Sequence, residues 1–125
     1  MSVRSTRDKG ITGEKTARKY LKKQGLKILD VNFRAKLGEI DIIAQEKDTL
    51  VFVEVKSAMN TAFGNPLDWI PLWKQRRIIR VSQLYMLNKG LHGRTHVRYD
   101  VVSVDPDRNV CHVRDAFRPE SAVFV

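Results

Sequence analysis

The residues best placed to do chemistry are charged side chains within two neighbouring apolar stretches, which read GEIDIIAQ and LVFVEVK. A polar turn, EKDT, separates the two stretches, and both are rich in β-branched residues, so they predict the strands of an antiparallel hairpin. With an even number of residues in the turn, Asp41 lies opposite Glu54, and Glu39 lies opposite Lys56. The opposite, apolar face is formed by Ile40, Ile42, Val53 and Val55. Because side chains alternate along a strand, the charged residues share one face of the sheet, about 5 Å apart across the pair.

An aspartate held opposite a glutamate predicts a cation between them. The two carboxylates repel each other, and partial burial favours protonation of at least one of them unless a positive charge intervenes. Oxygen ligands suit Mg²⁺ or Mn²⁺, and no His or Cys cluster accompanies Asp41 and Glu54 as zinc would require. Lys56, on the same face, is within reach of a water or a phosphate. The pattern therefore predicts metal-assisted hydrolysis, with the lysine stabilising charge on the phosphate.

Two other interpretations of these charges remain open. Edge strands carry outward charges that prevent aggregation, and Glu39 with Lys56 can form a plain surface ion pair. An odd-length turn or a bulge would place Asp41 and Glu54 on opposite faces and remove the site altogether. The register of the hairpin therefore decides between the interpretations.

The composition predicts a nucleic-acid partner. Lys and Arg outnumber Asp and Glu by 23 to 14, a net charge of +9, and such an excess favours a polyanion because neutralised phosphates release counterions. No stretch reaches the roughly 18 apolar residues of a membrane-spanning helix, so we expect no membrane insertion. The N-terminus has no apolar signal core and Cys111 is the only cysteine, which together favour the reducing cytoplasm.

The elements that position the hairpin are predicted from apolar periodicity. We expect a single domain over residues 1–125, with a core at about 13–114 and tails outside it. The expected elements are a helix at 13–24, strands at 26–33, 39–45 and 50–56, a helix at 74–90, and strands at 97–104 and 110–114. The order αβββαββ is typical of an α/β fold whose mixed central sheet is flanked by helices.

Several motifs in fixed order extend this prediction. The segment GEKTARKYLKKQGLKILDVNFR, the hairpin, FGNP, KQRRI and RYDVVSV follow one another between residues 13 and 104. This order resembles the YraN-like family of small bacterial proteins, and the hairpin resembles the Asp, Glu-x-Lys signature of the PD-(D/E)XK nuclease superfamily. The resemblance implies a restriction-endonuclease-like core similar to archaeal Holliday-junction resolvases. It also implies a metal-dependent endonuclease that cuts branched or damaged DNA in recombination or repair. A homodimer is compatible with this activity.

The resemblance also assigns roles to individual residues. Asp41 and Glu54 correspond to the metal-binding carboxylates and Lys56 to the motif lysine, with Mg²⁺ or Mn²⁺ as the ion. Glu14, in the first helix, corresponds to an acidic residue that resolvase-type members bring to the metal; the alternative is a glutamate favoured there by the helix dipole. Relatives often carry an arginine two positions after the motif lysine, where Ala58 stands in this chain.

Two further acidic residues and a set of basic ones complete the candidates. Glu39 is either a supporting group beside the site or a partner of Lys56, and Asp100, in RYDVV, supports the sheet near the site or has a structural role. The expected phosphate contacts are Arg34, Lys36, Lys74, Arg76, Arg77 and Arg80, in the turn before the hairpin and at the start of the second helix.

Trp69 and Trp73 lie in the irregular segment before the second helix. They can stack on unpaired bases, anchor the loop to the core or bury in a dimer contact. Two other functions therefore remain beside the endonuclease. One is a non-catalytic nucleic-acid-binding protein on a nuclease scaffold, and the other is a protein-protein adaptor that uses both tryptophans.

Overall fold

The computed structural model describes residues 6–57, 70–91 and 95–119 of the chain, with side chains from Gly13 onward. Its elements are α1 (Thr6–Lys23), β1 (Lys27–Ala35), β2 (Gly38–Glu46), β3 (Thr49–Ser57), α2 (Leu72–Asn88), β4 (His96–Val104) and β5 (Val110–Phe117). The predicted order αβββαββ is confirmed over these residues. The first helix begins earlier than predicted, at Thr6, and the last strand continues to Phe117.

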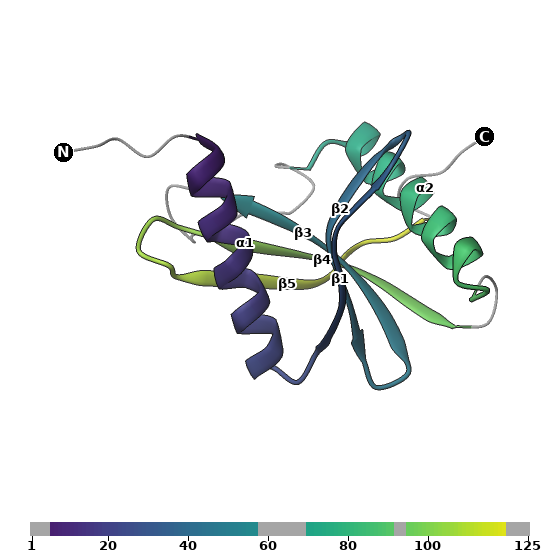
Figure 1. Ribbon diagram of the computed structural model, residues 1–125, viewed down its shortest axis with the longest axis horizontal. Coiled ribbons are helices and arrows are strands. Elements are labelled where there is room, and N and C mark those ends of the chain that lie inside the picture. The colour runs from purple at the N-terminus through teal and green to yellow at the C-terminus, as the bar shows by residue number, and fades with distance from the viewer. Residues whose placement is uncertain (1–5, 58–69, 92–94, 120–125) are drawn as a thin grey trace.

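The strands form one mixed sheet in the order β1-β2-β3-β4-β5. Neighbouring strands are antiparallel except β3 and β4, which are parallel. The chain passes through α2 between β3 and β4, as a parallel pair requires a crossover connection. Figure 1 shows the strongly twisted sheet with α1 across one face and α2 beside the β1–β2 hairpin. Of the described helices, neither has the length and apolar character needed to cross a membrane.

The sheet separates two apolar cores, one under each helix. The α2-side core includes Phe52, Ile79, Tyr85, Tyr99 and Phe117. The rings of Phe52 and Tyr99 stack with centroids 5.7 Å apart, and Tyr99 stacks on Phe117 at 5.3 Å. The α1-side core is smaller and includes Ala17, Leu21, Val51, Val53 and Val102. Strand β3 contributes to both cores, which explains why LVFV is apolar at successive positions rather than alternating.

The register of the β2–β3 hairpin is the predicted one, from the Glu46–Thr49 pair to the Ile42–Val53 pair. Beyond Ile42, β2 is paired with β1 alone, through Phe33 and Ile40. The expectation that Ile40 shares the α1-side face with Ile42 is wrong, because Ile40 packs in the α2-side core. The reason is that β2 leaves β3 at this point and the β1–β2 hairpin turns toward α2. Asn32 of β1, between the residues paired with Ile40 and Ile42, has a φ of 51°, which bends its strand.

Candidate functional site

Asp41 lies at the point where β2 separates from β3. Its Oδ2 accepts a hydrogen bond of 2.8 Å from the backbone N–H of Val55, so the aspartate side chain joins the strands beyond their last paired residues. The pKa of Asp41 is raised to about 7, chiefly by burial and then by the charge of Glu54, with smaller increases from Glu14 and Glu39, while the Val55 hydrogen bond lowers it. The structure therefore brings Asp41 under the influence of every acidic residue predicted for the site except Asp100.

We call Asp41, Glu54, Glu14 and Glu39 the acidic site. Glu54 is its most buried member, with a side chain that is 8% exposed. It emerges from β3 near Phe52, on the side that α2 covers, and its Oε1 lies 2.8 Å from Nζ of Lys74. Lys74 belongs to the first turn of α2 and was predicted as a phosphate contact. The structure places its ammonium group against Glu54 instead, because α2 begins directly over this part of β3.

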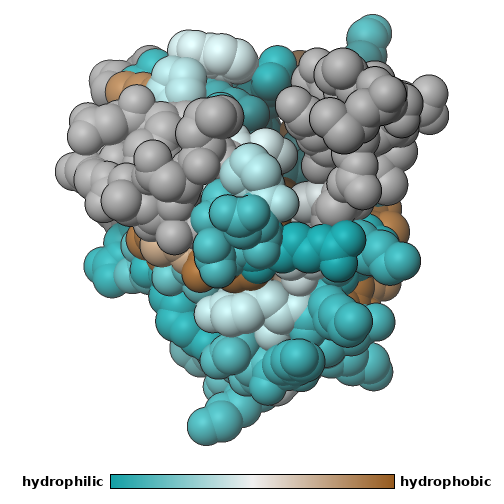
Figure 2. Space-filling model, turned by 90° about the vertical axis from the view of Figure 1, so that its left-hand side faces the viewer, coloured by the Kyte–Doolittle hydropathy of each residue, from teal (hydrophilic) through white to brown (hydrophobic). Residues whose placement is uncertain are grey.

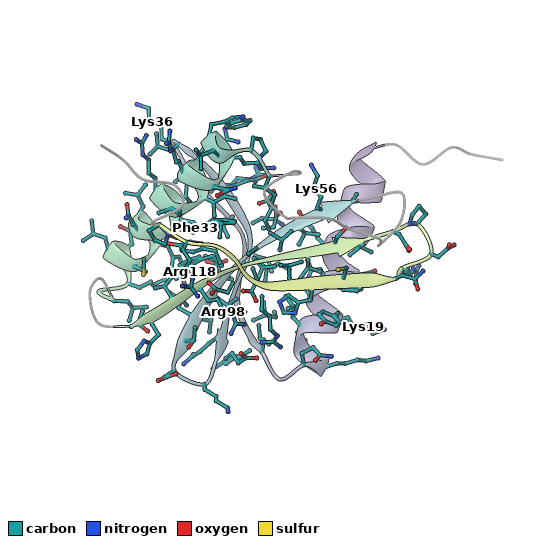
Figure 3. All side chains as sticks on the ribbon, turned by 180° about the vertical axis from the view of Figure 1, so that it is seen from behind. Lys19, Phe33, Lys36, Lys56, Arg98 and Arg118 are labelled. Atoms are coloured by element: carbon teal, nitrogen blue, oxygen red, sulfur yellow. The ribbon has the colours of Figure 1, made fainter. Side chains whose placement is uncertain are left out.

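Lys56 and Glu14 approach the site from different elements. Lys56 lies two residues beyond Glu54 in β3 and is partly buried, and Figure 3 shows it at the end of that strand, beside α1. α1 passes close to the same strand end, since a Cβ at Gly13 would lie 3.4 Å from Oγ of Ser57. This contact brings the following residue, Glu14, near enough for its charge to raise the pKa of Asp41.

The donor atoms of the acidic site fit Mg²⁺ or Mn²⁺. All of the candidate ligands are carboxylate oxygens, and Mg²⁺ is commonly held by one or two carboxylates together with waters and substrate phosphates. Within residues 6–57, 70–91 and 95–119, no three or more His, Cys, Asp or Glu side chains already stand close enough to enclose an ion. The side chains therefore fit an ion held by Asp41 and Glu54 with water, rather than a closed protein cage.

Glu39 does not pair with Lys56. Its Oε2 lies 3.2 Å from Nε of Arg34 on the neighbouring strand β1, in an ion pair whose side chains are 50% and 79% exposed. The expected partnership with Lys56 is wrong because β2 and β3 are no longer paired beyond Ile42. Glu39 nevertheless adds to the negative charge at Asp41.

Asp100 belongs to a different group of charges. Arg98 donates to both of its carboxylate oxygens, at 2.8 and 3.0 Å. His112 Nε2 lies 2.7 Å from Oδ2, and the backbone N–H of Asp115 donates to Oδ1 at 3.0 Å. Burial favours a raised pKa, but these hydrogen bonds outweigh it and hold the pKa of Asp100 below its usual range. Asp100 therefore supports the sheet through its own partners and does not contact the acidic site.

The same group extends to Glu46, which the sequence did not single out. Glu46 accepts from Arg98 at 2.9 Å and from Arg114 at 3.0 Å, and Tyr20 of α1 lies 3.3 Å from Nδ1 of His112. We call Asp100, Arg98, His112, Glu46 and Arg114 the Asp100 cluster. Its only sequence signal is the alternation of Arg98 and Asp100 in HVRYDVV, which places both side chains on one face of β4. Figure 3 shows Arg98 well apart from Lys56.

The predicted basic residues gather where α2 meets the β1–β2 turn. The guanidinium of Arg77 lies 4.9 Å from the ring centre of Trp73, whose side chain is exposed, and it packs against Gly38 of that turn. Gly38 has a φ of 155°, which favours glycine, and a Cβ there would lie 3.0 Å from Cδ of Arg77, so the arginine side chain would have to shift. Arg34 and Lys36 belong to the same hairpin end, where Figure 3 shows Lys36 beside α2.

The remaining basic candidates are less concentrated. Arg76 directly precedes Arg77 in α2 and is partly buried. Arg80 lies about one turn after Arg77 and is exposed. Trp69 and Ala58 lie outside the described residues. Figure 2, which views the molecule from the side of α1 and the β4–β5 turn, shows a predominantly hydrophilic surface with small apolar areas.

Comparison with known proteins confirms the resemblance to a family of small bacterial proteins. Residues 13–104 match the sequence model described as "Uncharacterised protein family UPF0102". A UPF0102 protein from Persephonella marina is 42% identical over 109 residues, covering 87% of this chain and 92% of the relative. One from Clostridioides difficile is 41% identical over 114 residues, covering 90% of this chain and 99% of the relative.

Among solved structures, a calcium complex of SfsA from Pyrococcus furiosus matches over 89% of this chain. The chain spans 64% of the length of that protein, with 15% sequence identity and a TM-score of 0.35. A likeness of this extent is too slight to establish a shared fold.

Proposed function

Because the chain belongs to the UPF0102 family, whose description gives no activity, we propose its function from the acidic site: a metal-dependent endonuclease that hydrolyses DNA phosphodiester bonds. The observation that carries this proposal is the state of Asp41. Its pKa is raised to about 7 by burial and by neighbouring carboxylates, so the site has more negative charge than its own residues neutralise. A strongly perturbed carboxylate beside a specific charge partner is typical of functional sites.

The fold supports the finer assignment to a restriction-endonuclease-like, PD-(D/E)XK core. The sheet is mixed, and each of its faces carries a helix. Asp41 comes from β2, Glu54 and Lys56 come from β3, and the two strands separate where these residues lie. This is the order of residues that the Asp, Glu-x-Lys signature implies.

The chain's own residues have distinct roles in this proposal. Asp41 and Glu54 would hold Mg²⁺ or Mn²⁺, and Glu14 would assist from α1 through its charge, which already acts on Asp41. When bound, such an ion supplies a Lewis acid and a more acidic water. Lys56 stabilises negative charge that develops on the scissile phosphate.

The surface around the β1–β2 turn provides the DNA contacts. Arg34, Lys36 and Arg77 hold backbone phosphates, which fixes the position of the DNA without reading its sequence. Trp73 is 59% exposed and can stack on a base that has no pairing partner. An unpaired base occurs at branches, flaps and damaged positions, and for this reason we propose branched or damaged DNA, the substrate of recombination and repair, over intact duplex.

Nuclease assays on matched variants test the proposal. Four-way, flap and linear duplex DNA are incubated with the protein and Mg²⁺ or Mn²⁺. We expect the branched substrates to be cut, and Asp41→Asn and Glu54→Gln to reduce the rate by roughly 100-fold or more, as for loss of a group that stabilises transition-state charge. Lys19→Met, an exposed residue of α1, is the control and retains the rate. Cleavage that continues unchanged in both carboxylate variants would overturn the assignment.

A second candidate function is a nucleic-acid-binding protein without catalysis. The observation that favours it is the Lys74–Glu54 ion pair, which already gives the most buried carboxylate of the site a cation. This candidate predicts DNA binding that weakens steeply with salt and is indifferent to divalent ions. Calorimetry decides between the two functions, because a Mn²⁺ site that is lost in Glu54→Gln excludes the non-catalytic interpretation.

A further inference from the structure

We propose that Lys74 is a built-in counter-ion of the acidic site, which occupies Glu54 in the metal-free protein and is displaced when a divalent ion binds. The inference rests on the proposed metal site at Asp41 and Glu54 and adds to it a residue outside the Asp, Glu-x-Lys signature. It makes the binding of the ion and the release of a lysine one coupled event.

The contact between Lys74 and Glu54 is short and shielded. Nζ of Lys74 lies 2.8 Å from Oε1 of Glu54, and the two side chains are 29% and 8% exposed. A buried carboxylate without a partner is costly, so a cation at this position stabilises the folded chain in the absence of metal. Lys74 is thus part of the metal-free site and not a surface charge.

The backbone at Lys74 is held in place while its side chain keeps the freedom to move. The adjacent Gln75 is buried and donates from Nε2 to the carbonyl of Ile70 at 2.9 Å, which fixes the first turn of α2. The backbone N–H of Lys74 itself donates to the carbonyl of Pro71. A lysine stem has four flexible carbons, so the ammonium group can leave Glu54 without any change in the helix.

The lysine neutralises only part of the acidic site. Lys74 contacts Glu54, whereas the protein contact that favours the charged form of Asp41 is the N–H of Val55. The site therefore still attracts a cation, and a divalent ion can neutralise both carboxylates where one ammonium group cannot. An Mg²⁺ or Mn²⁺ ion sits at about 2.0–2.2 Å from its oxygen ligands, so an ion on Glu54 would repel an ammonium group on the same carboxylate.

Once displaced from Glu54, the ammonium group of Lys74 can contact the DNA phosphate. An ammonium group that leaves Glu54 while its backbone stays fixed remains at the edge of the site, where the scissile phosphate would arrive. The contact with phosphate that the sequence predicts for Lys74 then exists only after the ion has bound. This coupling predicts that the divalent ion strengthens DNA binding as well as enabling cleavage.

Calorimetric titration of the protein with Mn²⁺ alone, at pH 7.5 and low salt, tests whether ion binding displaces Lys74. It needs no cleavage assay. Removing a competing cation strengthens binding, so we expect Lys74→Met to bind Mn²⁺ on the order of tenfold more tightly than wild type. Lys74→Arg keeps the charge and is expected to remain close to wild type. Lys19→Met, which removes the same charge from the exposed side of α1, is also expected to remain close to wild type.

Thermal unfolding provides a second measurement on the same proteins. We expect Lys74→Met to lower the melting temperature without metal, because Glu54 loses its partner, and we expect Mn²⁺ to raise it by more than in wild type. If Lys74→Met does not fold, Lys74→Gln serves in its place, since it removes the charge and keeps a polar group near Glu54.

The outcomes separate this inference from the proposed function. Mn²⁺ affinity in Lys74→Met that is equal to or weaker than that of wild type, with binding that is lost in Glu54→Gln, overturns the counter-ion role and leaves the metal site standing. No Mn²⁺ binding in any variant overturns both. Tighter Mn²⁺ binding in Lys74→Met, together with wild-type affinity in Lys74→Arg, supports the displacement of Lys74.

Discussion

Asp41 and Asp100 belong to the same sheet and both are shielded from water, yet their pKa values are shifted in opposite directions. Burial and the charges of Glu54, Glu14 and Glu39 raise the pKa of Asp41 to about 7. Burial also favours a raised pKa at Asp100, but hydrogen bonds from His112, Arg98 and the backbone of Asp115 outweigh it and lower the value. Asp100 is fully buried and Asp41 is partly buried, yet it is Asp41 that resists ionisation and Asp100 that is held ionised.

The difference lies in how fully each carboxylate is neutralised by the protein itself. In the Asp100 cluster, two carboxylates share Arg98, and Arg114 and His112 provide further partners. The cluster joins β2, β4 and β5, so its charges contribute to the fold. In the acidic site, the described cation contacts are the shielded one of Lys74 with Glu54 and the exposed one of Arg34 with Glu39, and the charges that act on Asp41 are those of neighbouring carboxylates. This incomplete neutralisation is the physical reason for our proposal of a metal at the acidic site.

The largest expected effect that separates the two regions is on stability. Asp100→Asn leaves Arg98 beside a side chain that can no longer balance its charge, and we expect a loss of about 3–5 kcal/mol in the free energy of unfolding. Asp41→Asn removes a repelled charge and keeps an oxygen for the Val55 N–H, so we expect metal-free stability at pH 8 to rise or stay constant. Urea unfolding at pH 8 without divalent ions measures both.

The same substitution, Asp→Asn, is made at both positions, so the two effects on stability can be compared directly. If Asp41→Asn and Asp100→Asn destabilise the protein equally, then Asp41 is a structural residue like Asp100, and the argument for a metal at the acidic site fails. Circular dichroism of each variant before unfolding shows whether the native secondary structure is retained.

Contacts between residues close in the sequence could be predicted at the acidic site, whereas the long-range contacts of the Asp100 cluster could not. The even-length turn between β2 and β3 could be predicted because turn length fixes the register of a hairpin. The strands follow that register from Glu46–Thr49 to Ile42–Val53, and the pairing ends one residue before Asp41 and Glu54, whose charges still interact. The face of Ile40 was predicted wrongly, because it depends on where β2 leaves β3, and this follows from packing against α2.

Contacts between elements distant in the sequence were beyond prediction from periodicity. Lys74 reaches Glu54 because the first turn of α2 lies against β3, and the place where a helix packs on a sheet is not encoded in a local pattern. Asp100 obtains its partners from β4 and β5 through a register that only the finished sheet defines. A buried charge in RYDVV predicts that partners exist but does not identify His112 or Glu46.

The second prediction concerns the effect of metal on stability. A ligand that binds only the folded state adds about 2.7 kcal/mol at one hundred times its dissociation constant. We expect Mn²⁺ to raise the free energy of unfolding of wild type by about this amount and to have little effect on Asp41→Asn. Urea unfolding with and without Mn²⁺ measures the difference. Equal stabilisation of both proteins would place the Mn²⁺ site elsewhere.

The third prediction is a dependence on pH that is specific to Asp41. Its pKa is raised in the folded state, so the stability it contributes is present below the unfolded pKa near 4 and is lost as pH rises through about 7. Relative to wild type, Asp41→Asn should therefore gain about 1–2 kcal/mol between pH 5 and pH 8, after allowance for solvent screening. Denaturant unfolding at both pH values provides the difference, and a gain that does not change with pH would contradict the raised pKa.

The smallest expected effect tests the boundary of the acidic site. Glu39 pairs with Arg34 in an exposed contact of 3.2 Å, and exposed ion pairs contribute at most about 1 kcal/mol. Glu39→Gln should change the free energy of unfolding by less than about 0.5 kcal/mol, while it removes one of the charges that raise the pKa of Asp41. The pKa of Asp41, measured by NMR titration of its carboxyl carbon, should therefore decrease without a comparable loss of stability. If the pKa stays constant, Glu39 belongs to the surface and the acidic site reduces to Asp41, Glu54 and Glu14.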